Sequence, residues 1–429
     1  MRKSFLLCLL PLALLACKHK DQPIVDPAYV DSLISNYRAS QRALVNDSNL
    51  AFWKRRLSSH PDNFVNGPEY ASALTSDFHL YGDINDLMRS DSLWNQSNIS
   101  NQQSEPGIFR TLASLAMLRH RFVLADSFLH KAIKLEGLSD PNAFLDFDIS
   151  FERGQYKHAK SLLDALRRTN SYAYLFRMSK YEHYNGSLDS SISYMHQASE
   201  KALNNKYLAQ VALSNTADLY IHKGDLSKAY ELYKQCIRID GADFHSIIGI
   251  GWLALVHDKN AALATKLFDF VSEYYHSPEP LLKLEQAAEE SNDTTKQLFY
   301  ARAFERKVAD SSYGKMYSKY LIDLYTGILN EPYKAEVLAQ QEIVNRPTPQ
   351  VYAWYVWSLY CNNEKDKAYA VFKQTVSGKP LEGPELYYMG KMMQGLNKGY
   401  NAQQFLSAAH SNRYDLSPSK IRDLENSLE

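Results

Sequence analysis

The segment Asn215–Cys236, NTADLYIHKGDLSKAYELYKQC, supports two different interpretations of the chain. It holds histidine, aspartate and cysteine close together in sequence, and these residue types bind metals or take part in redox chemistry. It also places Gly224–Asp225 between two stretches in which apolar residues recur at helical spacing. Whether that second pattern repeats elsewhere decides between a chemical site and a turn joining two amphipathic helices.

The packing pattern of the second stretch recurs along most of the chain. Ala229 precedes Tyr233 and Cys236, so a small residue is followed by larger ones at i+4 and i+7 on one helix face. The leading residues of this pattern are Ala125, Ala159, Ser191, Ala229, Ala264, Gln297, Ala335, Ala368 and Ala402. The steps between them are about 34, 32, 38, 35, 33, 38, 33 and 34 residues. A period this regular predicts one solenoid rather than separate domains.

A second set of positions supports the same period. Five residues before most leading residues stands a glycine or an asparagine: Gly154, Gly186, Gly224, Asn292, Asn330, Asn363 and Asn397. His120 and Lys259 occupy the corresponding places in the two other units. Glycine and asparagine tolerate the left-handed conformation that closes a helix, so each unit is predicted to be a helix, a tight turn and a second helix.

These units resemble the tetratricopeptide repeat family, whose units of 34 residues are helix–turn–helix. The unit around the opening segment matches the family pattern best, with Ala217 at position 8, Tyr220 at 11, Ala229 at 20 and Tyr233 at 24. Four residues depart from the pattern: Phe147, Trp252 and Glu285 at position 8, and Gln297 at position 20. The resemblance implies an all-α, right-handed superhelix of roughly nine to ten units, in which the unit 279–308 is the least regular.

The ends of the array are predicted to be capped by further helices. Asp26–Pro27 opens one helix, a second helix ends near His60, and Ser417–Pro418 starts a short charged helix at the far end. The polar segment Asn95–Gly107 is predicted to be a loop and possible hinge. The predicted divisions are 1–16 signal peptide, 17–25 tether, 26–67 N-terminal capping helices, 68–412 superhelix and 413–429 C-terminal capping helix.

The N-terminus resembles a bacterial lipoprotein signal. Arg2 and Lys3 precede an apolar run, Phe5–Ala16, which is too short to span a membrane and ends directly before Cys17. The resemblance implies that Cys17 becomes the acylated N-terminus of a protein of the cell envelope. Because Lys18 rather than aspartate follows the cysteine, it favours the outer membrane over the inner. The alternative is an ordinary signal peptide with an incidental cysteine.

Composition and motifs argue against nucleic-acid binding and catalysis. The chain has 48 Lys+Arg and 48 Asp+Glu residues, without the basic excess typical of nucleic-acid binders. A zinc-protease helix, a P-loop, a GxSxG elbow and paired CxxC motifs are all missing from the sequence. Gly249 and Gly251 fall inside a predicted first helix, where small residues allow close packing. We therefore predict no enzymatic activity, no metal and no cofactor.

The resemblance also implies where a partner binds. In tetratricopeptide arrays the concave groove is lined by fixed positions of each first helix. Carried over to this chain, the groove candidates are Phe144, Asp148, Phe151, Phe176, Lys180, His183, Tyr184, Asp218, His222, His257, Tyr317, Tyr320, Trp357, Tyr360, Tyr387 and Lys391. Aromatic anchors in a groove suit an extended peptide or a partner helix.

Histidines and cysteines are the remaining candidates for chemistry. His183, His222 and His257 fall at adjacent groove positions of three units, but neighbouring units stack about 10 Å apart, which is too far for their imidazoles to share a metal ion without bending inward. Cys236 and Cys361 lie in different units, beyond the about 7 Å Cα separation that a disulfide allows. Cys236 is therefore predicted to be a packing residue.

The sequence thus predicts a lipid-anchored envelope scaffold that binds a protein or peptide partner in its concave groove. A glycan-binding lipoprotein similar to the starch-utilisation type is the alternative, in which Trp357, Tyr360 and Tyr387 would stack on sugar rings. Such proteins usually carry long insertions between repeats, which this chain lacks. An enzyme accessory or a chaperone-like factor would differ from the first interpretation only in its partner.

Overall fold

The computed structural model describes residues 22–202 and 204–429, and within them the chain is helical with no strand. The predicted signal peptide and Cys17 lie outside the described residues. The helices are α1 (Pro27–Ser35), α2 (Gln41–Ser59), α3 (Asn66–Tyr81), α4 (Ile84–Ser100), α5 (Pro106–Leu118), α6 (Phe122–Glu136), α7 (Asp140–Glu152), α8 (Tyr156–Leu166), α9 (Tyr172–Tyr184), α10 (Leu188–Lys201), α11 (Lys206–Lys223), α12 (Leu226–Ile239), α13 (Phe244–Val256), α14 (Ala261–Tyr274), α15 (Glu279–Glu290), α16 (Thr294–Val308), α17 (Ser318–Thr326), α18 (Pro332–Asn345), α19 (Pro349–Cys361), α20 (Lys365–Thr375), α21 (Gly383–Gly395), α22 (Gly399–Ser411) and α23 (Pro418–Leu428), with short 3₁₀ turns η1 (Arg167–Thr169), η2 (Ser311–Tyr313) and η3 (Arg413–Asp415).

Helices α3 to α22 form ten successive helical hairpins, so the predicted α solenoid is confirmed. Every hairpin turn contains one residue with positive φ, from Gly82 in the first to Asn397 in the last. The two positions that carry neither glycine nor asparagine adopt the same conformation, with φ 51° at His120 and φ 53° at Lys259. The turn geometry is therefore set by the repeat even where the side chain disfavours it.

The predicted small residue lies at the contact between the two helices of each hairpin. Ala159, Ala229 and Ala368, for example, are fully buried there. The unit 279–308 departs at both contact positions, but its two departures pair with each other, because the Gln297 amide donates to the Glu285 carboxylate at 2.8 Å. Two polar residues thus replace the usual small pair, and burial raises the pKa of Glu285 to about 8.

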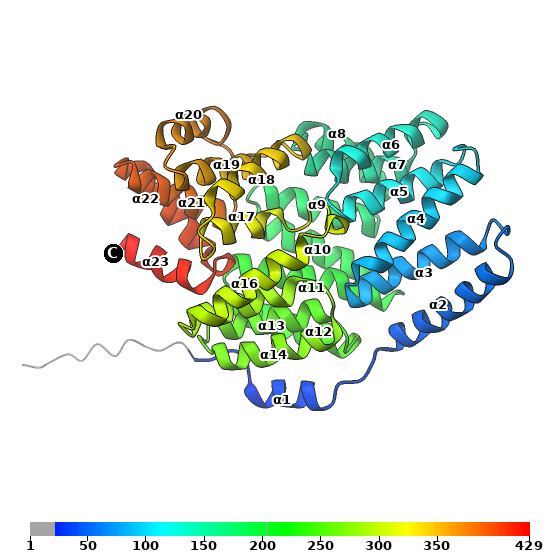
Figure 1. The fold of residues 1–429 in the computed structure, drawn as a ribbon, viewed down its shortest axis with the longest axis horizontal. Coiled ribbons are helices and arrows are strands. Elements are labelled where there is room, and N and C mark those ends of the chain that lie inside the picture. The colour runs from blue at the N-terminus through cyan, green and yellow to red at the C-terminus, as the bar shows by residue number, and fades with distance from the viewer. Residues whose placement is uncertain (1–21, 203) are drawn as a thin grey trace, which may run out of the picture.

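The superhelix closes on itself after nearly six repeats. The Asn345 side chain, which ends α18, bonds the backbone of His120 and Phe122 in the α5–α6 turn at 2.7 and 3.0 Å. The Arg119 guanidinium donates to the carbonyl of Ser312 at 2.7 Å, across 193 residues of sequence. In Figure 1 the hairpins α3–α8 and α17–α22 occupy opposite sides, with α9–α16 between them.

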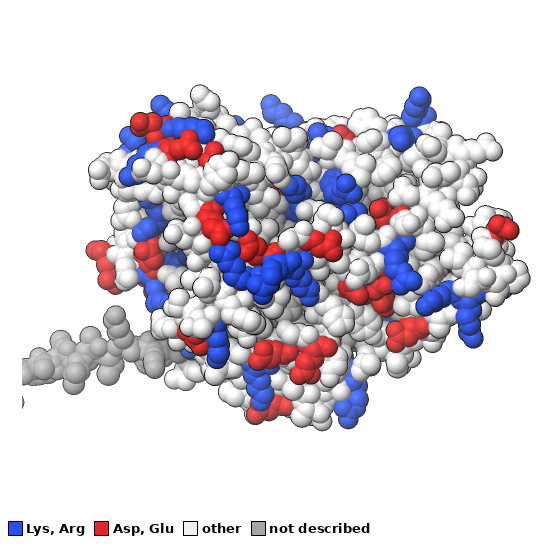
Figure 2. Space-filling model, in the orientation of Figure 1, with Lys and Arg blue, Asp and Glu red and all other residues white. Residues whose placement is uncertain are grey.

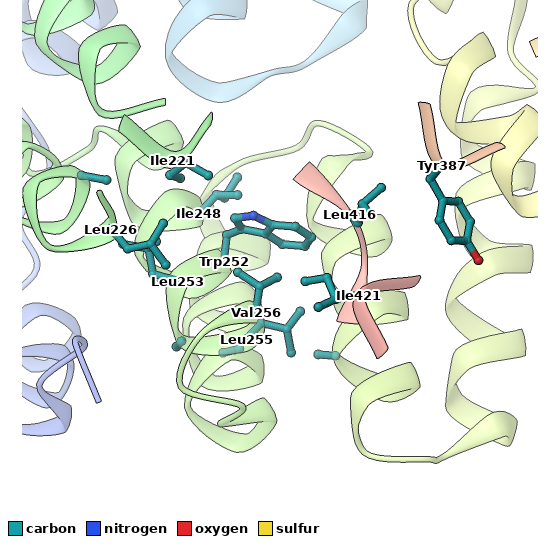
Figure 3. Close-up of a cluster of buried hydrophobic side chains, with 14 of the residues drawn as sticks. Ile221, Leu226, Ile248, Trp252, Leu253, Leu255, Val256, Tyr387, Leu416 and Ile421 are labelled. Carbon is teal, nitrogen blue, oxygen red and sulfur yellow. The ribbon is translucent and has the colours of Figure 1, made fainter. Parts of the chain in front are cut away.

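The C-terminal segment completes the closure. The predicted C-terminal helix is present as α23, and it packs on α22 as a cap would, but it also contacts α15, several hairpins earlier. The Trp252 indole of α13 donates to the carbonyl of Tyr414 at 2.8 Å. Figure 3 shows Trp252 pointing toward Leu416 and Ile421, both buried. The segment therefore joins the end of the array to its middle.

Two expectations about the N-terminal half are corrected. The segment Asn95–Gly107 is mostly helical, because α4 runs to Ser100 and α5 begins at Pro106. Its polar residues Ser97 and Asn98 are buried, so tertiary packing outweighs their low helix propensity. A hinge over the whole segment is thereby excluded, and only five residues connect the two helices.

The N-terminal helices do not form one cap. α2 packs against α3, where the Asn46 amide donates to Asp77 at 2.9 Å, as a cap of the first hairpin should. α1 instead contacts α14, in the sixth hairpin, and the Tyr37 ring lies 5.2 Å from the ring of Phe270. Residues 24 and 25, which the sequence assigns to a free tether, are also packed onto the body. No helix among the described residues is both long and apolar enough to cross a bilayer.

Candidate functional site

Three adjoining cavities run through the interior of the closed superhelix, and we call them the first, second and third cavities of the interior tract. Their volumes are about 490, 660 and 370 Å³. Lys180 lines both the first and the second, and His222, Lys319 and Tyr320 line both the second and the third. Most of the lining comes from first helices of the hairpins and from the connections between hairpins. The tract is therefore the concave groove of the array, enclosed by the next superhelical turn.

The first and second cavities meet at a charged cluster built from both turns. The Lys180 ammonium of α9 lies 2.7 Å from the Glu152 carboxylate of α7, and the Arg346 guanidinium that follows α18 reaches the same carboxylate at 3.4 Å. Arg346 also pairs with the fully buried Glu342 at 3.0 Å. Burial alone would raise the pKa of Glu152, but the two cations outweigh it and lower this pKa to about 2.

A second charged cluster lies across the second cavity. The Lys319 ammonium is 3.6 Å from the Glu385 carboxylate and 3.9 Å from that of Glu382. The Trp354 indole donates to one oxygen of Glu385 at 2.6 Å, while the other oxygen has no hydrogen-bond partner among the described residues. Burial raises the pKa of Glu385 despite Lys319. A buried acceptor without a partner costs about 1–3 kcal/mol, which a bound donor would recover.

Two of the three candidate histidines meet in this cavity. The rings of His183 and His222 are 4.8 Å apart, so these two side chains bend inward and lie closer than the about 10 Å stacking of neighbouring units suggests. His222 lies 2.8 Å from the Asp415 carboxylate, which outweighs burial and raises the pKa of His222. Burial and the neighbouring His222 charge lower the pKa of His183. At neutral pH the pair therefore presents one neutral and one more readily charged imidazole.

The third cavity is lined by a mixed aromatic and charged wall. Asp218 accepts a hydrogen bond from the Tyr233 hydroxyl and lies 3.0 Å from the His245 ring nitrogen. The Asp218 carboxylate raises the pKa of His245 to about 10, against the effect of burial. The Lys283 ammonium lies 3.9 Å from the centre of the Trp252 ring, a cation–π contact. Positive and negative groups thus occur together in the second and third cavities, and Figure 2 shows both signs interspersed on the outer face as well.

The structure brings half of the predicted groove residues into this tract. The residues that line it are Asp148, Phe151, Lys180, His183, Tyr184, Asp218, His222 and Tyr320. Tyr320 keeps 42% of its surface exposed although it lies inside the ring, so the cavity admits water. Whether these residues bind a partner stays a prediction.

The other half lie elsewhere. Phe144 packs under the Arg177 guanidinium, Phe176 lies beside Tyr172, and Tyr317 bonds Ser277. His257 pairs with Asp258 beside the N-terminal segment rather than with the other histidines. Tyr387 and Lys391 both contact Asp423, at 2.7 and 3.0 Å, so α23 covers the groove at the last hairpin. Tyr387 and Lys391 lie outside the tract because the C-terminal segment returns along the concave face there.

The aromatic residues on which glycan stacking would depend are engaged with each other. The Trp357 ring is stacked with Tyr360 at 5.6 Å and with Tyr388 at 5.1 Å, and its indole nitrogen donates to Thr326. The Tyr387 hydroxyl is bound to Asp423. Trp357 and Tyr387 are therefore already engaged with neighbouring side chains.

Several lining residues carry no signal in the repeat pattern. Arg346, Glu382 and Asp415 come from segments between helices, and Lys319 precedes the predicted Tyr320 in α17. Within residues 22–202 and 204–429, no group of three or more His, Cys, Asp or Glu side chains is arranged to hold a metal ion. Cys236 and Cys361 are free, and burial raises the pKa of each thiol to about 12. The tract is thus suited to holding charged groups by hydrogen bonds and ion pairs.

The helical hairpins, with their left-handed turns and small contact residues, make this a tetratricopeptide-like solenoid. No family model matches the sequence, and no curated protein matches it significantly.

Among solved structures, the chain is similar to the Cut9–Hcn1 hetero-tetramer of the APC/C, with 13% identity over 93% of this chain and 69% of that one, at a TM-score of 0.49. It is also similar to PilF of Pseudomonas aeruginosa, with 14% identity over 50% and 97% and a TM-score of 0.37. A tetratricopeptide repeat protein of Parabacteroides merdae shows 13% identity over 76% and 98%, with a TM-score of 0.31.

Proposed function

We propose that this protein is a lipid-anchored, non-catalytic scaffold of the cell envelope that holds a polypeptide segment of a partner protein in its interior tract. The observation that carries the proposal is the continuity of the three cavities through shared lining residues. A helical-repeat solenoid typically presents its concave face to partners, and here that face is enclosed. An enclosed groove admits an extended segment or a chain end rather than a globular surface.

The lining favours a polypeptide over a glycan. The first cavity is largely apolar around Trp94, Leu115 and Leu145, whereas the second and third carry paired charges of both signs. A polypeptide supplies apolar, acidic and basic side chains along one extended chain, and its backbone supplies donors for acceptors such as Glu385. A neutral sugar carries no charged group that could add to these ion pairs.

Photo-cross-linking from inside the tract tests this binding. Tyr320 is replaced by a photoreactive phenylalanine in cells, and Tyr333, 71% exposed on α18, is replaced in the same way as a matched control. We expect the variant at Tyr320, but not the one at Tyr333, to form a discrete protein adduct that mass spectrometry identifies. No adduct from Tyr320, or the same adducts from both positions, would refute the tract as a protein-binding site.

Binding to a panel of oligosaccharides tests whether the ligand is a glycan instead of a polypeptide. Purified protein that bound oligosaccharides, and lost that binding in Tyr320→Ala, would replace the polypeptide interpretation by the glycan one.

The lipid anchor rests on the sequence around Cys17, and we propose attachment to the outer membrane. A single acyl chain binds a membrane only marginally, whereas several chains on one cysteine hold it stably. The variant Cys17→Ser should therefore move the protein from the membrane pellet to the soluble fraction. If Cys17→Ser still sediments with membranes at the wild-type level, the anchor is not at this cysteine.

A further inference from the structure

The chain directly after the proposed anchor is held against the body by a single buried carboxylate. The backbone amides of Ile24 and Val25 each donate to one oxygen of Asp258, both at 2.9 Å. The Asp258 side chain is only 2% exposed, and it is 234 residues away from Ile24 in sequence. One carboxylate that accepts two consecutive backbone amides fixes both the position and the direction of the chain.

The next residues continue this attachment. Val25 and Val30 are buried in the same core as α12, α13 and α14. The backbone amide of Asp26 donates to the Tyr230 hydroxyl at 3.3 Å. In Figure 1 the described chain begins beside the start of α14 and α1 then runs along that helix. Residues 24–30 are thus part of the folded body, not of a flexible tether.

The same place is linked to one end of the interior tract. Asp258 bonds His257 at 2.7 Å, and the His257 ring lies 6.4 Å from the ring of Tyr414, which lines the third cavity. The first cavity, between α3, α5 and α7, lies at the other end of the tract. The attachment of the N-terminal segment is therefore next to the third cavity.

We infer that the end of the molecule formed by Asp258, the start of α14 and Tyr414 faces the lipid surface, so that the third cavity opens toward the membrane and the first away from it. The inference rests on the proposed acylation of Cys17. Six residues lie between Cys17 and the fixed Ile24, and the seven Cα–Cα steps from Cys17 to Ile24 span about 25 Å when fully extended. Figure 1 places the start of the described chain and the α3–α4 hairpin on opposite sides of the body, so an anchor this close to Ile24 keeps the attachment side nearest the bilayer.

This geometry sets an order of contact with a partner in the same membrane. A polypeptide that emerges from a membrane-bound partner meets the third cavity, with its Asp218–His245 pair and Lys283, before the apolar first cavity.

Energy transfer to the bilayer tests the orientation. The full acylated protein is reconstituted into vesicles of phosphatidylethanolamine and phosphatidylglycerol that contain an acceptor-labelled lipid, with a donor dye on Ala262→Cys at the start of α14 or on Asp62→Cys between α2 and α3. Both native positions are exposed, and Figure 1 places the α2–α3 turn on the opposite side of the molecule from the start of the described chain. We expect at least twofold greater transfer from position 262 than from position 62. Equal transfer from the two positions would overturn the orientation.

Two changes near the anchor make the test more specific. Insertion of twenty Gly/Ser residues after Lys20 lengthens the segment between Cys17 and Ile24 without changing the body. The difference in energy transfer between positions 262 and 62 should then vanish. Asp258→Ala frees the chain as far as Val30, which can lie about 45 Å from Cys17 at full extension. This variant should reduce the difference in energy transfer. Lys266→Ala is the control, because it removes only a surface pair with Asp31 and should leave the difference unchanged. If the difference in energy transfer remained after the insertion, the short segment after Cys17 would not determine the orientation.

The failure of acylation is distinguishable from the failure of this inference. If the mass of the N-terminal peptide shows an unmodified Cys17, the proposed anchor fails, and the membrane orientation that depends on it fails with it. If Cys17 is acylated and the protein binds the vesicles but shows equal transfer, only the orientation fails. Cys236 and Cys361 do not compete for the dye, because burial raises the pKa of each thiol to about 12.

Discussion

The Glu152 carboxylate joins two turns of the superhelix, so its replacement by glutamine measures what that closure contributes. The pKa of Glu152 is lowered from about 4.5 to about 2, because Lys180 and Arg346 outweigh burial. A shift of one pKa unit corresponds to about 1.4 kcal/mol, so the ionised form stabilises the fold by about 3 kcal/mol relative to the neutral form. The side chain is 24% exposed, which keeps solvent screening small. Glu152→Gln keeps the shape and removes the charge.

The pH dependence gives the prediction its sign. A lowered carboxyl pKa means that the stabilisation is complete above about pH 4.5 and is lost as the pH falls toward 2. In urea unfolding followed by tryptophan fluorescence, Glu152→Gln should be less stable than wild type by about 3 kcal/mol at pH 7 and by about 1.4 kcal/mol at pH 3.

A surface pair provides the control for this experiment. Asp164 pairs with Lys160 within α8, and its side chain is 64% exposed. Asp164→Asn should change the free energy of unfolding by less than about 0.5 kcal/mol at both pH values. A difference below about 1 kcal/mol for Glu152→Gln at pH 7, or one that does not change with pH, would refute the assignment of the pKa shift to Lys180 and Arg346.

Two further predictions concern packing and titration. Gly249→Ala should destabilise the fold by about 1–3 kcal/mol in calorimetry, because a Cβ there would lie 2.4 Å from the Tyr233 ring. Gly67→Ala is the control, since nothing lies within 4 Å of the added Cβ, and it should be neutral or slightly stabilising. Equal effects of the two substitutions would contradict the packing argument. Asp415→Asn should lower the pKa of His222 in NMR titrations. In the wild type, the ion pair between His222 and Asp415 should weaken as the pH rises through the raised pKa of His222. An unchanged His222 titration in the variant would contradict the contact between the two side chains.

The local structure followed from the sequence because it depends on contacts within one hairpin. Left-handed turns at Gly154 and Asn363 and buried contact residues such as Ala229 are set by residues a few positions apart. The pairing of Gln297 with Glu285 also lies within one hairpin, although the family pattern marks both as departures. A prediction that compared the two helix positions as a pair would have found it.

The closure of the superhelix was not predictable from the repeat pattern. It depends on small rotations between successive hairpins, which add up over nearly six units before Arg346 meets Glu152, 194 residues away. No periodic signal marks Arg346 or Asp415, since both lie between helices. For the same reason the groove positions Tyr387 and Lys391 were misplaced, because the chain that covers them follows the last repeat.

The contacts between turns constrain how this protein can change in length. A linear array gains or loses repeats at its ends with little effect on the remainder, because each unit touches only its neighbours. Here Asn345 must meet His120, and Trp252 must meet Tyr414, so one added or deleted hairpin between them would shift every such pair out of register. The number of units between the joined turns is thereby fixed, and such a chain evolves by substitution within its hairpins rather than by their duplication.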